Sequence, residues 1–194
     1  MSSNTLSDKY TSRYREQYNS KIISLLKESL SLKNIMEVPH LEKIVLNSCY
    51  SPAVTDSKKL KKLSSELSLI AGQSTVMTKA RRSLAGFHLR EGMPLGVKVT
   101  LRKDNMYDFL DKLINIAMPR IKDFNAYDSN KHFDHHANFN FGLVDQTIFP
   151  EIDYDNIDFS WGMNVTIVTS TSNKEHSKAL LEQFNFPFKK SASK

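Results

Sequence analysis

Three segments of this chain alternate apolar and polar residues one by one, and this pattern constrains the fold more than any other feature. They cover residues 41–47, 97–102 and 163–170. Successive side chains of a strand point to opposite faces, so each segment predicts a strand with one apolar face. In the second, Val97 and Val99 share one face while Lys98 lies on the other. A sheet built from such strands needs cover on one face only.

Apolar residues that recur every three or four positions predict the helices that supply this cover. They span residues 8–32, 56–71, 104–117 and 173–184. Gly72 is expected to end the second of them and Asp104 to cap the third. The first is either a helix or an arm that runs into one.

Shorter strands are expected at residues 75–78, 139–142 and 147–149, and residues 125–138 predict a loop because they have no steady period. Helices and strands do not follow a strict β-α-β order. The expected fold is therefore α+β, a largely antiparallel sheet with helices packed on one face, plus a long basic loop and an N-terminal helix or arm.

The 194 residues are enough for one domain with a sizeable core. We expect an arm over residues 1–17, a single domain over residues 18–190 and a tail over residues 191–194. No apolar run approaches the roughly 20 residues that cross a bilayer, so no membrane partner is expected. Cys49 is the only cysteine, which excludes an intrachain disulfide, and we expect a small buried side chain there.

Charge is divided between two regions of the chain. Residues 58–103 carry eleven Lys or Arg against two acids, and residues 123–158 carry eight acids against Lys131 alone. The net charges are +9 and −7, in a chain whose total is +6. These regions predict two partners of opposite charge, the alternative being ordinary solvated faces.

The basic region combines several chemistries that suit RNA. Gly86 permits close approach of the backbone to a ligand. Other side chains in this region can neutralise phosphates, bond phosphate or ribose, or stack on unpaired bases. They are, in that order, Lys79, Arg81, Arg82 and Arg90; Gln73, Thr78 and Ser83; Phe87 and His88.

Signatures of catalysis are missing from the sequence: there is no nucleotide-binding loop, nucleophile elbow or metalloprotease motif. We therefore expect no enzyme and no cofactor. One rival is a metal-dependent RNA phosphodiesterase that uses Glu151, Asp153 and His136. Another is a basic RNA chaperone without selectivity. Residues 132–136 hold three histidines and could bind zinc, but a solvent-facing loop is preferred.

Four longer motifs then carry a resemblance. They are VMTKARRSLAGF at residues 76–87, GMPLGVKVTLR at residues 92–102, IAMPRIKDF at residues 116–124 and IFPEIDYD at residues 148–155. With these motifs, the chain resembles the large-subunit ribosomal protein five family, the bacterial-type proteins that bind 5S rRNA. The resemblance implies a non-enzymatic constituent of the central protuberance, bound to 5S rRNA and large-subunit rRNA, with no homo-oligomer.

The resemblance also implies three sets of site residues. The polar face of the sheet would bind 5S rRNA through Lys43, Asn47, Gln73, Thr78, Lys98, Thr100 and Arg102. The basic loop would reach tRNA in the peptidyl site through Lys79, Arg81, Arg82, Ser83 and Phe87. The loop before the later strands would bridge to a basic small-subunit head protein through Asp123, Asp128, Asp134 and Asp145.

Two motifs depart from the family pattern. Residues 48–54 read SCYSPAV where the family has a glycine-rich turn, and residues 133–139 read FDHHANF where it typically has FDGRGNY. Histidine replaces the missing arginine charge only in part near neutral pH. Together with MNVTIVTS at residues 163–170, these departures resemble organelle versions. A mitochondrial ribosome is therefore favoured, with the bacterial cytoplasm as the alternative.

Overall fold

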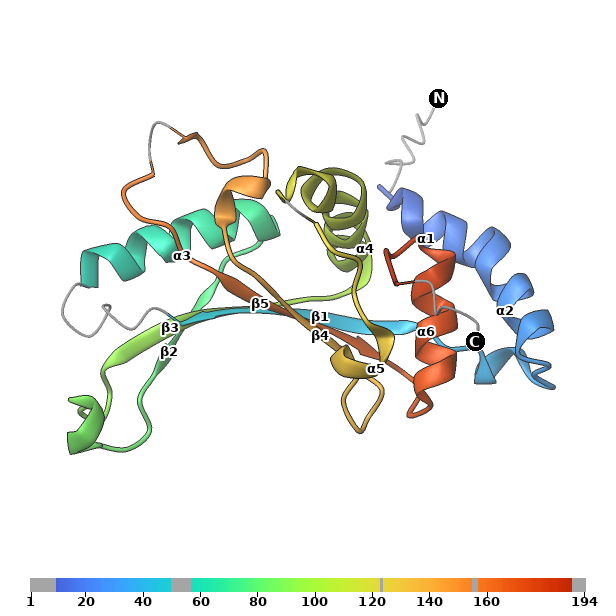
Figure 1. The fold of residues 1–194 in the computed structure, drawn as a ribbon, viewed down its shortest axis with the longest axis horizontal. Coiled ribbons are helices and arrows are strands. Elements are labelled where there is room, and N and C mark those ends of the chain that lie inside the picture. Colours follow the sequence, from blue (N-terminus) through green and yellow to red (C-terminus); the bar gives the residue numbers. More distant parts are fainter. Residues whose placement is uncertain (1–9, 50–56, 123, 155–156, 190–194) are drawn as a thin grey trace, which may run out of the picture.

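A five-stranded antiparallel sheet lies at the centre of the molecule (Figure 1). The computed structural model describes residues 10–49, 57–122, 124–154 and 157–189. The strand order is β2-β3-β1-β5-β4. The strands are β1 (Leu41–Cys49), β2 (Val76–Lys79), β3 (Pro94–Leu101), β4 (Phe139–Leu143) and β5 (Met163–Thr169).

Helices cover one face of this sheet, as the alternating pattern predicted (Figure 1). The longest is α3 (Ser57–Ala71), followed by α4 (Lys103–Lys112) and α6 (Lys174–Gln183). The N-terminal run is α1 (Arg13–Gln17), the π-helix η1 (Tyr18–Ile22) and α2 (Ile23–Ser29). The short turns are η2 (Ile35–Glu37), η4 (Ala85–Phe87), η5 (Leu113–Ala117), η6 (Met118–Arg120), α5 (Ser129–His132) and η7 (Gln146–Ile148). The α+β expectation is confirmed.

The core lies between the sheet and these helices. Ile44 and Leu46 of β1 and Leu101 of β3 are fully buried, and they face the helices. The apolar stripe of α3 packs on them with Leu60, Leu63, Leu67 and Ile70. Gly72 ends α3 with a φ of +63°, a left-handed conformation that glycine adopts without strain.

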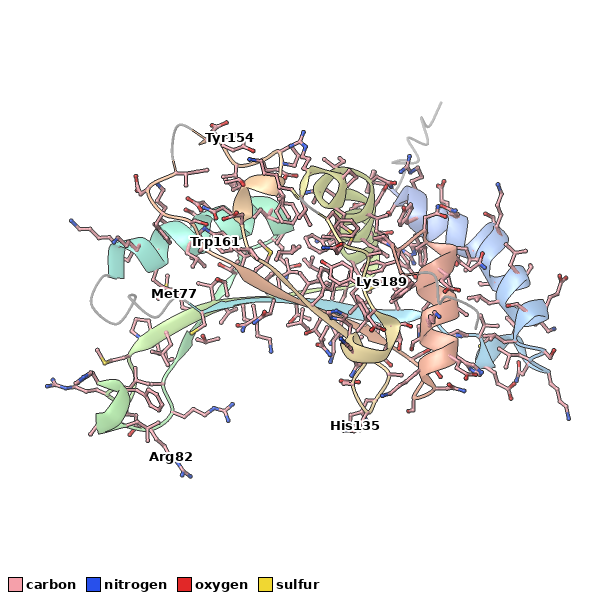
Figure 2. The ribbon with its side chains drawn as sticks, in the orientation of Figure 1. Met77, Arg82, His135, Tyr154, Trp161 and Lys189 are labelled. Atoms are coloured by element: carbon pink, nitrogen blue, oxygen red, sulfur yellow. The ribbon has the colours of Figure 1, made fainter. Side chains whose placement is uncertain are left out.

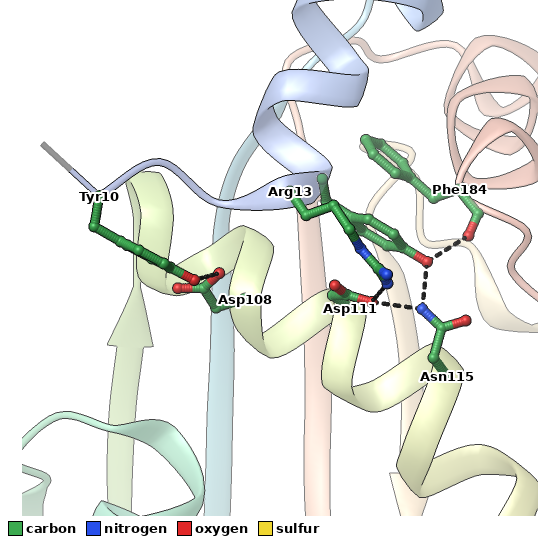
Figure 3. A network of polar contacts seen from close by, with 7 residues as sticks. Tyr10, Arg13, Asp108, Asp111, Asn115 and Phe184 are labelled. Atoms are coloured by element: carbon green, nitrogen blue, oxygen red, sulfur yellow. Dashed lines mark hydrogen bonds and ion pairs between the residues drawn. The ribbon is translucent and has the colours of Figure 1, made fainter. Parts of the chain in front are cut away.

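The segment expected as an arm is docked on α4 from Tyr10 onward (Figure 3). The hydroxyl of Tyr10 donates to Asp108 at 2.9 Å, and the Arg13 guanidinium pairs with Asp111 at 2.6 Å. The Tyr14 hydroxyl accepts a hydrogen bond from Asn115 at 2.9 Å. These contacts hold α1 along one side of α4.

Four local expectations are wrong. Asp104 does not cap α4; Arg102 is at the cap position, and Asp104 binds Arg15 at 2.8 Å. Residues 147–149 form no strand, because residues 146–148 make the 3₁₀ turn η7. Residues 125–138 contain the helix α5. Cys49 is exposed, because the alternation of β1 continues to that position and places its side chain on the polar face.

The expected cap of α3 at residues 55–56 and most of the altered turn at residues 48–54 lie outside the described residues. Within the described part of the chain, no helix has the length and apolar character needed to cross a membrane.

Candidate nucleic-acid interface

The second face of the sheet carries no helix (Figure 1). Two segments project on this side, at opposite ends of the sheet. One is the connection between β2 and β3, residues 80–93, which we call the basic arm. The other is the turn after α5, residues 133–138, which we call the histidine turn. Figure 2 shows Arg82 and His135 on this side and Tyr154 on the helix side.

Strand register brings most of the expected 5S rRNA residues together. Asn47 of β1 lies opposite Lys98 of β3, and Thr100 lies opposite Val45 in the next row. Lys43 lies on the same face of β1, two residues before Val45. We call this helix-free surface the open face, and its polar side chains from β1 and β3 are Lys43, Asn47, Lys98 and Thr100.

The other three expected residues lie at the margin of the open face. Thr78 of β2 lies opposite Gly96, at the edge of the sheet. The Gln73 side chain is exposed and donates a hydrogen bond to the Thr100 carbonyl at 3.2 Å. Arg102 is exposed and follows β3 in extended conformation. The structure therefore assembles these residues into one surface without testing what they bind.

Three residues of the open face were missed from the sequence. Asn164 of β5 lies opposite Asn47, and Thr166 lies opposite Val45. Thr166 donates to Asn140 of β4 at 2.7 Å. The alternation of residues 163–170 already marked Asn164 and Thr166 as polar, but it could not show that β5 pairs directly with β1.

Backbone hydrogen bonds shape the basic arm as a hairpin. Ala80 donates to the Met93 carbonyl at 2.8 Å and accepts from the Gly92 amide at 3.0 Å. Further out, Leu84 and Leu89 exchange two hydrogen bonds of 2.9 and 3.1 Å. The tip is the 3₁₀ turn η4, which ends at His88 with a φ of +53°.

All five residues expected to contact tRNA are exposed on or beside this arm. Ser83 is tied to the opposite side of the hairpin, because its hydroxyl accepts from the Glu91 amide at 3.0 Å. Phe87 at the tip is 73% exposed. The exposed cations are Lys79, Arg81 and Arg82. An exposed ring beside cations can stack on a base while the cations contact phosphates.

The acidic residues expected at the bridge are not gathered in one place. Asp128 lies just before α5, and Asp134 begins the loop portion of the histidine turn, on the side of the open face. Asp145 precedes η7, where the chain crosses to the helix side, and it accepts a hydrogen bond from Ser160. Asp123 lies outside the described residues.

Asp134 uses its carboxylate inside its own turn. One oxygen accepts from the backbone amides of His136 at 2.9 Å and Asn138 at 2.8 Å, and the other accepts from the Asn138 side chain at 2.9 Å. Burial opposes the charge and by itself would raise the pKa, but these hydrogen bonds and the nearby His136 hold the pKa of Asp134 below its ordinary 3.8.

The residues of the phosphodiesterase rival are not brought together. Glu151 pairs with Lys112 at 2.6 Å. Its segment contains Tyr154, which lies on the helix side, whereas His135 beside His136 lies on the other side (Figure 2). His132 turns inward, with Nδ1 2.9 Å from the Asn140 carbonyl oxygen. Among the described residues, no three acidic, histidine or cysteine side chains form a group that could hold a metal ion.

A polar sheet face flanked by a basic hairpin defines the class of ribonucleoprotein components. Comparison with known families narrows the class: ribosomal protein L5 matches residues 34–90, and the C-terminal part of the same ribosomal family matches residues 94–188. The chain belongs to the ribosomal protein L5 family. It is thus a structural, non-enzymatic constituent of the large ribosomal subunit, with rRNA as its partner.

Bacterial relatives match nearly the whole chain. The large ribosomal subunit protein uL5 of Fusobacterium nucleatum subsp. nucleatum is 48% identical over 183 residues, which cover 94% of this chain and 100% of the relative. The large ribosomal subunit protein uL5 of Geotalea daltonii is 50% identical over 177 residues, which cover 91% and 98%. These comparisons do not support the preference for a mitochondrial ribosome.

Proposed function

We propose that this protein holds 5S rRNA in the central protuberance of the large subunit, with the open face as its binding surface. One observation carries the proposal. Polar side chains run across three neighbouring strands on the one face of the sheet that no helix covers. Such a surface lets side chains bond the ribose, phosphates and base edges of an irregular RNA.

Asn47 and Thr100 are the central residues of this surface. Both are half-buried, and neither side chain has a hydrogen-bond partner within the described residues. A polar group in that position gains a partner only when a ligand covers it. RNA bound there would meet two preorganised side chains on a rigid sheet, with Lys98 beside them to neutralise a phosphate.

The basic arm belongs to a second contact in this proposal, with tRNA in the peptidyl site. Its backbone is hydrogen-bonded as far as Leu84 and Leu89, so the tip stands away from the sheet while its base stays fixed. The exposed side chains of Arg81, Arg82 and Phe87 then present charge and a stacking ring to an RNA other than 5S rRNA.

The third contact is the bridge to a small-subunit head protein of basic surface. It is expected from Asp123, Asp128, Asp134 and Asp145. Asp145 is exposed and retains its charge toward solvent. Asp134 contributes least, since its two oxygens already accept three hydrogen bonds.

Replacing Asn47 or Thr100 by alanine tests the open face. Either change is expected to weaken binding of 5S rRNA by about 1–3 kcal/mol, because the RNA group that it bonded is left buried and unpaired. The measurement is a titration of 5S rRNA at fixed salt. Asn105→Ala, an exposed position on α4, is the matched control and should bind as the wild type does. Unchanged affinity in both open-face variants would exclude this surface.

A further inference from the structure

The histidine turn lies on the same side of the sheet as the open face, at the end opposite the basic arm (Figure 1). We infer that this turn is a second RNA contact, at which the exposed imidazoles of His135 and His136 bind a backbone phosphate of the RNA on the open face. The inference rests on the proposed 5S rRNA binding and names a further part of the same surface.

The turn is built to hold these two side chains outward. Phe133 is buried at one end and packs edge to face on Phe139, with 5.1 Å between ring centroids. At the other end Ala137 is fully buried, has a φ of +60°, and its carbonyl accepts from Thr169 at 3.3 Å. His135 and His136 lie between these anchors, and both are exposed.

Asp134 fixes the backbone between the anchors. It bonds the amides of His136 and Asn138 through its carboxylate and exchanges backbone hydrogen bonds with Asn138 and Ala137. Because the conformation is set before any ligand arrives, little ordering entropy opposes binding by the exposed rings.

Charge favours RNA over a basic protein as the occupant. The exposed groups of this segment that can carry charge are Lys131, His135 and His136, all cationic when protonated. Asp134, the one acid within the turn, directs its oxygens at the backbone. The surface is also continuous with the open face, since the turn leads directly into β4, whose Asn140 bonds Thr166 on that face.

Neighbouring titratable groups must be accounted for in any test by pH. Asp128 and His132 precede the turn, and the first turn of α6 carries Lys174, Glu175 and His176. That helix is joined to the turn through Thr169, which bonds both Ser177 and the Ala137 carbonyl. Asp134 has a lowered pKa and remains ionised between pH 6 and 8, so it adds no change of charge in that interval.

The experiment compares binding of 5S rRNA by the full chain at pH 6 and pH 8 in low salt. An exposed imidazole ordinarily titrates near pH 6.5. Wild-type affinity is expected to rise about threefold to tenfold at pH 6, the range of one or two exposed ion pairs. In His135→Gln with His136→Gln the rise disappears, while affinity at pH 8 stays that of the wild type. The slope of log affinity against log salt at pH 6 falls by about 1.

Two single variants serve as matched controls. His88→Gln removes an exposed histidine from the basic arm, and His176→Gln removes one from α6. Both should keep the rise at pH 6. A rise that survives in the double variant, or that is lost in either control, overturns the inference and leaves a protein partner for the turn.

The same titration separates this inference from the proposed function. Asn47→Ala should lower affinity for 5S rRNA at both pH values. If the wild type does not prefer 5S rRNA at all, the proposed function fails. If it prefers 5S rRNA but keeps its pH response without His135 and His136, only the inference about the histidine turn fails.

Discussion

Gly96 lies where β3 approaches the backbone of β1 most closely among the glycines of the sheet. A Cβ atom there would be 2.5 Å from the Ser48 carbonyl oxygen, a distance that real Cβ contacts do not reach. Gly142, on the open side of β4, has more room, because its nearest neighbour would be Asn164 Oδ1 at 3.5 Å. Two glycines in one sheet thus have different reasons to be there.

The contrast predicts the stability of two alanine variants. Gly96→Ala should lower the free energy of unfolding by about 1–3 kcal/mol, since the neighbouring backbone must shift to admit the methyl group. Gly142→Ala should change it by less than about 0.5 kcal/mol. Urea unfolding followed by circular dichroism measures both. Equal stability of the two variants would show that β1 and β3 are not packed this tightly.

Individual burial was predictable where a strict period set it. Ile44 and Leu46 are buried because alternation and the helical cover agree. Cys49 was assigned to the core on residue type alone, and that assignment failed because side-chain direction in a strand depends on register, not on apolarity. Similarly, Asp104 has the chemistry of a cap, but Arg15 from a distant segment binds it.

At the scale of elements, an aromatic cluster joins the N-terminal helices to α4 and α6. Tyr18 stacks near Phe184 with 6.3 Å between centroids and lies 6.3 Å from Tyr107. The Tyr18 hydroxyl donates to the Pro39 carbonyl at 3.1 Å. Burial raises the pKa of Tyr18 and of Tyr107 to about 12.

These raised values predict alkaline destabilisation. The native state holds the two phenolic protons more tightly than the unfolded chain, where tyrosine titrates near 10.0. The stabilisation is complete below pH 10 and is lost as the pH rises through 12. Free energies of unfolding measured from pH 8 to 11.5 should fall above pH 10.

Phenylalanine variants identify the source of that loss. Tyr18→Phe should cost about 0.5–1.5 kcal/mol at pH 8, from the lost hydrogen bond, and should fall less steeply above pH 10. Tyr154→Phe, at an exposed tyrosine, should keep the wild-type slope. An unchanged slope in Tyr18→Phe would mean that this ring is not buried against α4 and α6.

Element type was predictable for periodic segments, namely the strands β1, β3 and β5 and the helices α3, α4 and α6. The exceptions are short. Residues 147–149 are apolar enough for a strand, yet Phe149 is buried by packing on Phe109, which no local pattern reveals. The helix α5 is four residues long, below the length at which a period can be recognised.

At the scale of the whole molecule, the candidate RNA surfaces share one side of the sheet, and helices occupy the other (Figure 1). The charge pattern predicted a basic and an acidic region, but not that the acids would be divided between the two sides. That division follows from the crossing of residues 145–162 to the helix side, a consequence of strand order that periodicity does not encode.

Separation of the basic arm from the open face predicts separate defects. Arg81→Ala with Arg82→Ala should leave 5S rRNA affinity within about twofold, and weaken peptidyl-site tRNA binding to assembled ribosomes about threefold to tenfold, as expected for two exposed contacts. Lys21→Ala with Lys33→Ala removes the same charge at the far end of the molecule and should do neither. A large loss of 5S rRNA affinity in the arm variant would contradict this division.

The most direct measurement is a titration of the purified protein with its cognate 5S rRNA and with an unrelated RNA of equal length, each at two salt concentrations. Recognition by the open face predicts a preference for 5S rRNA of about a thousandfold or more, the low end of specificity ratios known for DNA-binding proteins. The preference should shrink in Asn47→Ala. Equal affinity for both RNAs, with a steep dependence on salt, would show attraction by charge alone and contradict recognition by this surface.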